Sequence, residues 1–382
     1  MARIVLGSYM VRYPLGGNLS WALQWLVGFQ RLGHDVYFVE KSGYPSSCFD
    51  PRRNVMGDDC TYGVTALHEL LGRFGLERRW CFVDAAGGYH GLARGEIEAV
   101  FRSTDLFVDM GTHGSWLPEA AAAKLRVLIE AEPGFTQMKM AHRLATGEAL
   151  AEYDRHYSIG QNIGTRASTA PCAGRTWHQV FNPVVPDLFE TTPAPADAPF
   201  TTVMNWRAHD TISFDGRDFG QKDVEFARFV DLPARTAVPL ELAVAGADVP
   251  TDFLRARGWR LRSAHVLTMS VDSFKGYVLA SRGEFSVCKN VFVATRSGWF
   301  SDRSAAYLAS ARPVVMQDTG FSAHLPCGEG LFAVATVEEA AAALDEVAAN
   351  YARHSGAARE IAQQYLAAAK VLTRFLDELG VS

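Results

Sequence analysis

The sequence predicts an α/β protein of two doubly wound, Rossmann-like domains that face each other across a cleft. Short apolar runs rich in Val, Ile and Leu alternate with segments of helical periodicity in both halves of the chain. A stretch at 183–199 separates the halves and holds five of the sixteen prolines, a composition typical of an interdomain linker. A length of 382 residues also suits two domains better than one.

The first domain is expected to begin with a buried strand at Arg3–Met10. Apolar residues then recur at helical spacing over Leu19–Leu32, and Gly33 suits the left-handed residue that ends such a helix. A second strand at Asp35–Glu40 follows after so short a crossover that the two strands should be parallel and covered on both faces. Further strands are expected at Trp80–Asp84, Asp105–Gly111 and Arg126–Gly134.

The second domain repeats this alternation. Strands are expected at 200–206, 240–246, 259–264, 313–317 and 331–335, with helices at Ser304–Ser310, Val337–Ala349 and about Gly356–Leu379. The predicted organisation is a first domain at 1–182, a linker at 183–200, a second domain at 201–360, and a helix at 361–382 that returns to the first domain.

Composition limits the classes of binding partner and the cellular compartment that we expect for this protein. The net charge of −5 gives no basic footprint for nucleic acid. The six cysteines are far apart without a CxxC pair, which argues against a structural zinc site or a disulfide framework. No signal peptide and no apolar run of about 20 residues is visible. We expect a cytoplasmic protein without a membrane span, and the sequence is compatible with a homodimer.

A glycine pair, Gly16-Gly17, followed by Asn18, stands between the first strand and the first helix. Glycines let a ligand approach the main chain, and the following helix offers free N–H groups. The pair does not fit GxGxxG, because Ser20 and Trp21 occupy the later positions, so a dinucleotide enzyme is disfavoured. An ordinary tight turn is the alternative interpretation. Trp21, like Trp25 and Trp116, can either stack on an acceptor or pack in the core.

The segment 295–321 is the most informative part of the sequence. Ser297-Gly298 predicts a turn, Ser301 or Asp302 can cap the following helix, and the next strand ends in the turn Asp318-Thr319-Gly320. A helix start and a polar loop at one sheet edge can hold a diphosphate and sugar hydroxyls. A βαβ unit with ordinary caps explains the helix but not this clustering.

Three motifs resemble those of two-domain glycosyltransferases of the GT-B fold. "SGWFS" with "ARPVV" is similar to HCGWNS…GVPVV, "RPVVMQDTGF" resembles PVVRDTGG, and "GGNLSWALQWLVGFQRLGHDVYFVE" is similar to GGH-helix-GHEVTFV. The resemblance covers essentially the whole chain. It implies an acceptor site in the first domain and a nucleotide-sugar site in the second.

The resemblance also assigns residues to the donor. It implies diphosphate contacts from Ser297, Gly298, Ser301, Arg207 and Lys222, phosphate or nucleoside contact from Lys289, and sugar contacts from Asp318, Thr319 and Gly320. Arg296 stands where the family has a histidine and would bring a fixed charge to the phosphate. The family's ribose-binding glutamate falls on Ala306, and Asp302, one turn earlier, would replace it.

Asn18 stands where the family often has the histidine that deprotonates the acceptor. An amide is no base, so Asn18 can only bind or orient a substrate. An inverting reaction would then take its base from Asp109 or His113, which end a predicted central strand, or from the alternatives His90, Glu130 and Glu132. A retaining reaction needs no such base.

These observations predict a glycosyltransferase that moves a sugar from a UDP- or dTDP-sugar to a small-molecule acceptor, which we expect to be a natural product. No D-x-D motif occurs, so cations and helix N–H groups are expected to replace a metal. No cofactor is expected, since the nucleotide sugar is a co-substrate. A nucleotide-sugar epimerase and a non-catalytic nucleotide-sugar-binding protein are the alternatives.

Overall fold

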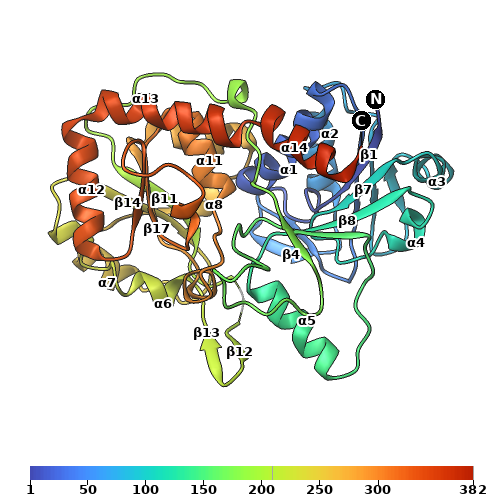
Figure 1. Cartoon of the computed structure of the whole chain (residues 1–382). Coiled ribbons are helices and arrows are strands. Elements are labelled where there is room, and N and C mark those ends of the chain that lie inside the picture. Colours follow the sequence, from blue (N-terminus) through green and yellow to red (C-terminus); the bar gives the residue numbers. More distant parts are fainter. Residues whose placement is uncertain (209, 382) are drawn as a thin grey trace.

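The computed structural model describes residues 1–208 and 210–381 and contains two parallel sheets, one in each half of the chain (Figure 1). The first sheet has eight strands in the order β10-β9-β8-β7-β1-β2-β5-β6. The second has six strands in the order β15-β14-β11-β16-β17-β18. Within these sheets only the edge pair β5–β6 is antiparallel among the described residues. The predicted fold class is confirmed.

The expected elements of the N-terminal half are present. They are β1 (Arg3–Gly7), α1 (Gly16–Arg31), β2 (Asp35–Lys41), β5 (Trp80–Val83), β7 (Leu106–Asp109) and β8 (Leu125–Glu130). The structure adds shorter strands: β3 (Cys48–Asp50), β4 (Val55–Gly57), β6 (Tyr89–Gly91), β9 (Arg155–Ser158) and β10 (Trp177–Gln179). It also adds the helices α2 (Thr61–Gly72), α3 (Arg94–Arg102), α4 (Leu117–Ala120) and α5 (Phe135–Ala145).

The C-terminal half is built in the same way. Its sheet strands are β11 (Phe200–Asn205), β14 (Leu240–Ala245), β15 (Arg260–Ser263), β16 (Gly283–Ser286), β17 (Val314–Gln317) and β18 (Leu331–Val334), and a small hairpin pairs β12 (Ile212–Phe214) with β13 (Arg217–Phe219). Its helices are α6 (Lys222–Phe226), α7 (Thr251–Ala256), α8 (Ala264–Leu267), α9 (Val271–Ala280), α10 (Asn290–Ala294), α11 (Asp302–Ala309), α12 (Val337–Ala349), α13 (Tyr351–Ile361) and α14 (Ala368–Leu379).

The single terminal helix predicted at 356–379 is wrong in one respect. The chain forms α13, a π-helical turn at Ala362–Leu366 and then α14, with an extended residue, Ala367, before α14. Val184 causes this break, because its N–H donates to the Leu366 carbonyl and its carbonyl accepts from the Ala368 N–H. Backbone groups that would continue the helix are therefore taken by the segment that joins the two halves.

Helix α14 lies on α1 of the N-terminal half, as Figure 1 shows near the top of the molecule. Gly28 allows this approach, since a Cβ there would lie 2.5 Å from a methyl of Leu372. The rings of Trp25 and Phe375 meet edge to face at 6.1 Å in the same interface. The core that includes these side chains is continuous across both halves. The boundaries expected at 182, 200 and 360 stay a prediction.

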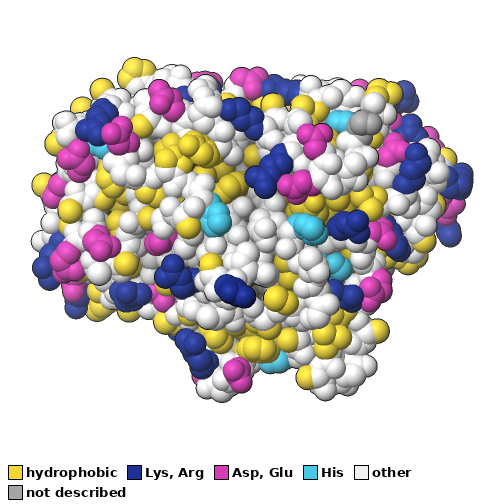
Figure 2. Space-filling model, viewed as in Figure 1, with side chains coloured by type: hydrophobic (Ala, Val, Ile, Leu, Met, Phe, Trp, Pro, Cys, Tyr) yellow, Lys and Arg dark blue, Asp and Glu magenta, His cyan; other side chains and the backbone are white. Residues whose placement is uncertain are grey.

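Charged side chains are mixed on the molecular face drawn in Figure 2, where Lys and Arg alternate with Asp and Glu and form no basic stripe. Among the residues that the structure describes, no helix is long and apolar enough to cross a membrane.

Candidate functional site

The carboxyl ends of strands from both sheets meet where the two halves of the molecule touch. Lys289, three residues beyond β16, places its Nζ 2.6 and 2.5 Å from the two carboxylate oxygens of Glu132, two residues beyond β8. Ligands of open α/β sheets bind at these strand ends. The ion pair therefore marks the region in which a ligand could touch both halves.

Lys222 brings a positive charge into this region. Its side chain is only 7% exposed, and its ammonium has no hydrogen-bond or ion-pair partner in residues 1–208 and 210–381. Burial and the nearby Arg303 guanidinium lower the pKa of Lys222 to about 7, and Lys289 adds to this effect. The nearby Glu284 carboxylate opposes this shift only in part. A mostly buried ammonium without a direct partner is costly, and a bound anion would supply one.

Arg303 adds positive charge next to Lys222, but its guanidinium is hydrogen-bonded to other groups of the protein. Its guanidinium bonds to the Glu284 carboxylate at 2.5 Å, the Val203 carbonyl at 2.9 Å and the Ser286 hydroxyl at 2.5 Å. Glu284 is fully buried, so this pair is shielded from water. Arg303 is thus fixed next to Lys222, and Lys222 is left as the cation that a ligand can use.

Helix α11 begins beside these cations. Ser301 caps it, because its hydroxyl accepts from the Arg303 N–H at 3.2 Å, as the sequence predicted for Ser301 or Asp302. Burial raises the pKa of Asp302, and Arg303 opposes this shift. Burial also raises the pKa of Tyr9, two residues beyond β1, with smaller contributions from Glu132 and Asp302. The start of α11 therefore faces the first loop of the N-terminal half.

The turn Arg296–Gly298 is covered by the N-terminal half. The Asn162 N–H donates to the Ser297 carbonyl at 3.0 Å, and the Gln161 N–H donates to the Gly298 carbonyl at 3.2 Å. Ser297 and Gly298 are buried, and a Cβ on Gly298 would lie 2.7 Å from the Asn162 nitrogen. Arg296 has an exposed side chain and a φ of +50°. This turn joins the two halves, and the diphosphate contacts expected from it stay a prediction.

The loop Asp318-Thr319-Gly320 lies against that turn, since the Thr319 carbonyl accepts from the Gly298 N–H at 2.8 Å. Asp318 accepts from the Gly320 N–H and from the Ser322 hydroxyl, both at 2.8 Å. The Thr319 hydroxyl donates to the Trp299 carbonyl at 2.7 Å. The structure brings the two predicted loops together, with their polar groups bonded to one another.

Arg207 is half-exposed and lies beside the Lys222 segment. It is bonded to Asp223 at 2.6 Å and to Asp248 at 3.2 Å. Gln221, just before Lys222, has both side-chain amide atoms buried without a partner among the described residues. No sequence pattern pointed to Gln221, whereas the Lys222 prediction came from its place in "GQKDVEF".

The two glycines of the pair Gly16-Gly17 have different surroundings. A Cβ on Gly16 would lie 2.0 Å from the Ser270 carbonyl oxygen, so this glycine is required by contact with the start of α9. Gly17 has open space where a Cβ would be. Asn18 donates its amide to the carbonyls of Tyr9 and Tyr13, the latter at 2.9 Å, and thereby holds the loop between β1 and α1.

Trp21 is buried and has a structural partner. Its indole N–H donates to the Asn182 side chain at 2.9 Å, and its ring lies against Tyr9 at 5.9 Å. These contacts connect α1 to the segment between the halves. They favour the packing role over stacking on an acceptor.

Asp109 and His113 occupy the loop after β7 in different ways. The fully buried Asp109 carboxylate accepts from the N–H groups of Gly111, Thr112 and Gly114 and from the Tyr153 hydroxyl, at 2.7–3.1 Å. His113 is exposed and has a φ of +53°. Desolvation of its ring lowers the pKa of His113, and Asp109 opposes the shift. Asp109 shapes the loop, and His113 presents a neutral imidazole from it.

Two cavities lie away from Lys222. One of about 420 Å³ is lined by residues of both halves, among them His324 and Lys370. The other, of about 500 Å³, lies between α2 and the start of α9 and includes Leu19. Neither cavity is lined by Lys222, and we therefore place the candidate site by the chemistry of its side chains.

The comparisons with known proteins agree with this architecture. No protein-family model matches the chain, and no curated protein matches it. Solved structures match over the full length. HepE of Anabaena, solved with UDP, is 13% identical with a TM-score of 0.54, each chain covered completely. Sucrose-phosphate synthase of Thermosynechococcus elongatus is 13% identical, with a TM-score of 0.54 over 100% of this chain and 99% of that one.

An alpha-glucosyltransferase solved with UDP and a 13-mer DNA is 11% identical, with a TM-score of 0.58 over 99% of both chains. At such identities the likeness establishes the fold alone. The chain has the GT-B fold, two Rossmann-like halves that meet at the carboxyl ends of their strands.

Proposed function

We propose that this protein transfers a sugar from a UDP- or dTDP-sugar to a small-molecule acceptor, without a metal ion. One observation carries the proposal. Lys222 is a nearly buried lysine whose ammonium has no hydrogen-bond or ion-pair partner in the part of the chain that the structure describes, at the strand ends of the C-terminal sheet. A nucleoside diphosphate supplies such a partner. The fold is shared with proteins solved with UDP, which supports the same ligand class.

In the proposed reaction the bond between the anomeric carbon and the diphosphate oxygen breaks, and the bond from the acceptor oxygen to that carbon forms. Negative charge grows on the departing diphosphate. The Lys222 ammonium and the positive end of α11 stabilise it, because a preorganised charge costs no reorganisation during the step. Lys289 can join them if the ligand draws it away from Glu132.

The acceptor proton needs a destination if configuration is inverted. We assign this role to His113, whose lowered pKa keeps the imidazole neutral and able to accept a proton at pH 7. Asp109 is the positioning residue, since it accepts three hydrogen bonds from the loop that carries His113 and a fourth from the Tyr153 hydroxyl. Glu132, the alternative, is ion-paired with Lys289.

The acceptor is proposed to be a small natural product that enters beside Gly17 in the first turn of α1, where a Cβ would contact no other atom. One structural neighbour was solved with DNA. A net charge of −5 and the mixed charges in Figure 2 give no electrostatic support for such an acceptor here.

Calorimetric titration with UDP and dTDP tests the donor site. We expect wild-type protein to bind one of them and Lys222→Met to lose about a hundredfold in affinity, as for a buried charge-assisted contact. Lys124→Met is the matched control, because the Lys124 side chain is 79% exposed and forms a surface ion pair with Asp105. Equal affinity in all three proteins would contradict the proposal.

Product analysis separates the proposed reaction from its alternatives. UDP-glucose is incubated with and without a panel of phenolic and macrolide acceptors. Glycosylated acceptor identifies a transferase, and an isomeric nucleotide sugar formed without acceptor identifies an epimerase. Binding without any turnover across the panel would identify a binding protein and overturn the proposed transfer.

A further inference from the structure

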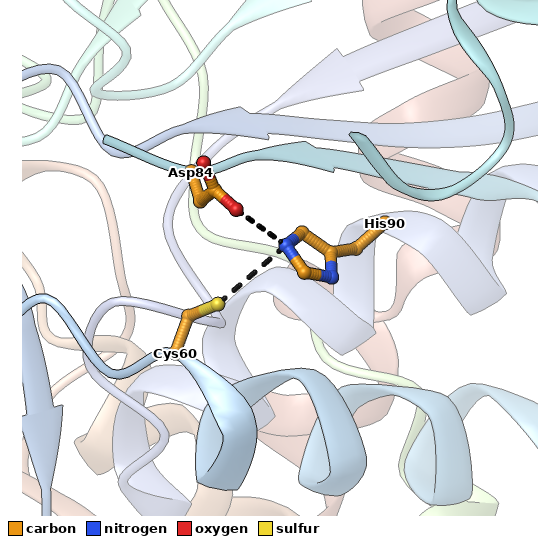
Figure 3. A group of neighbouring side chains, drawn as sticks. All are labelled: Cys60, Asp84 and His90. Carbon is orange, nitrogen blue, oxygen red and sulfur yellow. Dashed lines mark hydrogen bonds and ion pairs between the residues drawn. The ribbon is translucent and has the colours of Figure 1, made fainter. Parts of the chain in front are cut away.

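Three side chains from separate parts of the N-terminal half converge outside the proposed donor site. Cys60 precedes α2, Asp84 follows β5, and His90 lies on the edge strand β6 (Figure 3). Their potential ligand atoms all lie within 4.8 Å of one another. His90 Nε2 is central, 2.8 Å from Asp84 Oδ2 and 3.7 Å from Cys60 Sγ. The cluster could not be recognised in the sequence, because its members are 24 and 6 positions apart.

We propose that Cys60, Asp84 and His90 form a binding site for a zinc-like divalent transition-metal ion. Thiolate, imidazole and carboxylate together are a ligand set typical of zinc, and three protein ligands leave the fourth position for water. The proposal does not depend on the donor site, and the transfer reaction does not pass through this ion.

One of the two measured distances fits such an ion closely, and the other requires a small shift. Tetrahedral bonds of about 2.3 Å to sulfur and about 2.05 Å to nitrogen place these two atoms about 3.5 Å apart, near the observed 3.7 Å. Nitrogen and oxygen ligands should be about 3.3 Å apart, so the 2.8 Å hydrogen bond between His90 and Asp84 must lengthen by about 0.5 Å. The ion replaces the proton that now lies between them.

The surroundings orient the ligands. Asp84 Oδ1 accepts from the N–H groups of Ala86 and Gly88, at 2.9 and 2.8 Å, which leaves Oδ2 directed at His90. The His90 ring packs against Phe82 at 5.9 Å. Cys60 is 9% exposed, while the side chains of Asp84 and His90 are 22% and 32% exposed. An ion can therefore enter from solvent and meet a thiol that is already enclosed.

The ion would act as a clip. It would connect the start of α2 to the antiparallel edge pair β5–β6, which are joined here by side-chain hydrogen bonds.

Cobalt substitution tests the site. Full-length protein is treated with a chelator, dialysed and titrated with Co²⁺. We expect one equivalent to bind with a thiolate-to-cobalt band in the near ultraviolet and strong visible bands of a tetrahedral site, and Zn²⁺ to abolish both. Cys60→Ser should lose the ultraviolet band, whereas the exposed-thiol controls Cys172→Ser and Cys327→Ser should keep it.

A second readout guards against a folding defect in Cys60→Ser. Zn²⁺ should raise the thermal midpoint of the wild-type protein but not of His90→Gln or Asp84→Asn. Absence of the thiolate band in wild type, or its survival in Cys60→Ser, would overturn the site and leave a hydrogen-bonded Cys–His–Asp cluster. UDP titration after chelation is independent of either result.

Discussion

The strand ends of the two halves hold their buried charges in opposite ways. In the N-terminal half, Glu40, Asp109 and Glu130 are buried carboxylates that accept bonds from nearby donors. Glu40 accepts from three successive backbone N–H groups at Met10–Arg12, at 2.7–3.0 Å. In the C-terminal half, Lys222 has no partner among the residues described.

This difference distinguishes buried charged groups that stabilise the fold from a charged group that is available to a ligand. A buried carboxylate whose oxygens accept bonds from the protein holds the segments that donate those bonds, and its substitution should act on stability. A buried ammonium left without a partner lowers the stability of the free protein and is retained where a ligand completes it. Glu40 and Glu130 still show the cost of burial, which raises the pKa of each to about 7.

The largest effect is expected from removing the hydrogen-bonded carboxylate of Asp109. Asp109→Ala leaves three backbone N–H groups and the Tyr153 hydroxyl without their acceptor. We expect the free energy of unfolding to fall by about 3–5 kcal/mol, measured by urea denaturation. The exposed Asp197→Ala should stay within about 0.5 kcal/mol of wild type. A small loss in Asp109→Ala would show that the loop does not need its carboxylate.

His113 tests a role in the reaction rather than in stability, because it lies close to Asp109 in the sequence but is exposed. His113→Gln should lower kcat for acceptor glycosylation by about a hundredfold or more, while the thermal midpoint stays near that of wild type. The pH dependence of kcat/KM should also lose its acidic limb. Unchanged kcat would remove His113 from the reaction and favour a retaining mechanism.

Lys222 should show the opposite sign of stability effect to Asp109. Lys222→Met removes a charge that burial disfavours, so the thermal midpoint of the ligand-free protein should rise by several degrees. The pKa of Lys222 is about 7 against 10.5 in the unfolded chain, so the unfolded state binds more protons between these values. Wild-type stability should therefore gain from Lys222 as pH rises through that window, and Lys222→Met should lack this gain.

The smallest effect is the pH dependence of donor binding. A bound diphosphate raises the pKa of Lys222, so UDP affinity should be flat just below pH 7 and fall above it, by up to about tenfold per pH unit. Isothermal titrations from pH 6.5 to 9 measure this slope. Lys222→Met should flatten it, and a wild-type slope that survives in that variant would assign the titration to another group.

Much of the fold could be predicted from the sequence because buried parallel strands are near-continuous apolar runs. β1, β5, β7 and β17 are all of this kind. Short elements such as β6 and β12 carry too little pattern to be recognised. The helix break at Ala367 depends on hydrogen bonds from Val184, about 180 residues away, which no local pattern contains.

The parts of the candidate site that could be predicted are those determined by residues close together in the sequence. Lys222 stands in a polar motif, and Ser301 is a sequence-visible cap. The role of Gly16 was not visible, because its close neighbour, the Ser270 carbonyl, comes from the other half. The burial of the Arg296–Gly298 turn was likewise not visible in the sequence, because Gln161 and Asn162, which pack against it, come from the other half.

Proton uptake during UDP binding tests the central claim most directly. Wild-type protein is titrated with UDP at pH 8 in phosphate-free buffers of low and high ionisation enthalpy. Because Lys222 is mostly neutral at pH 8 and must be protonated to hold the diphosphate, the account predicts uptake of most of one proton, lost in Lys222→Met. Binding with no buffer dependence, or uptake that persists in Lys222→Met, would contradict it.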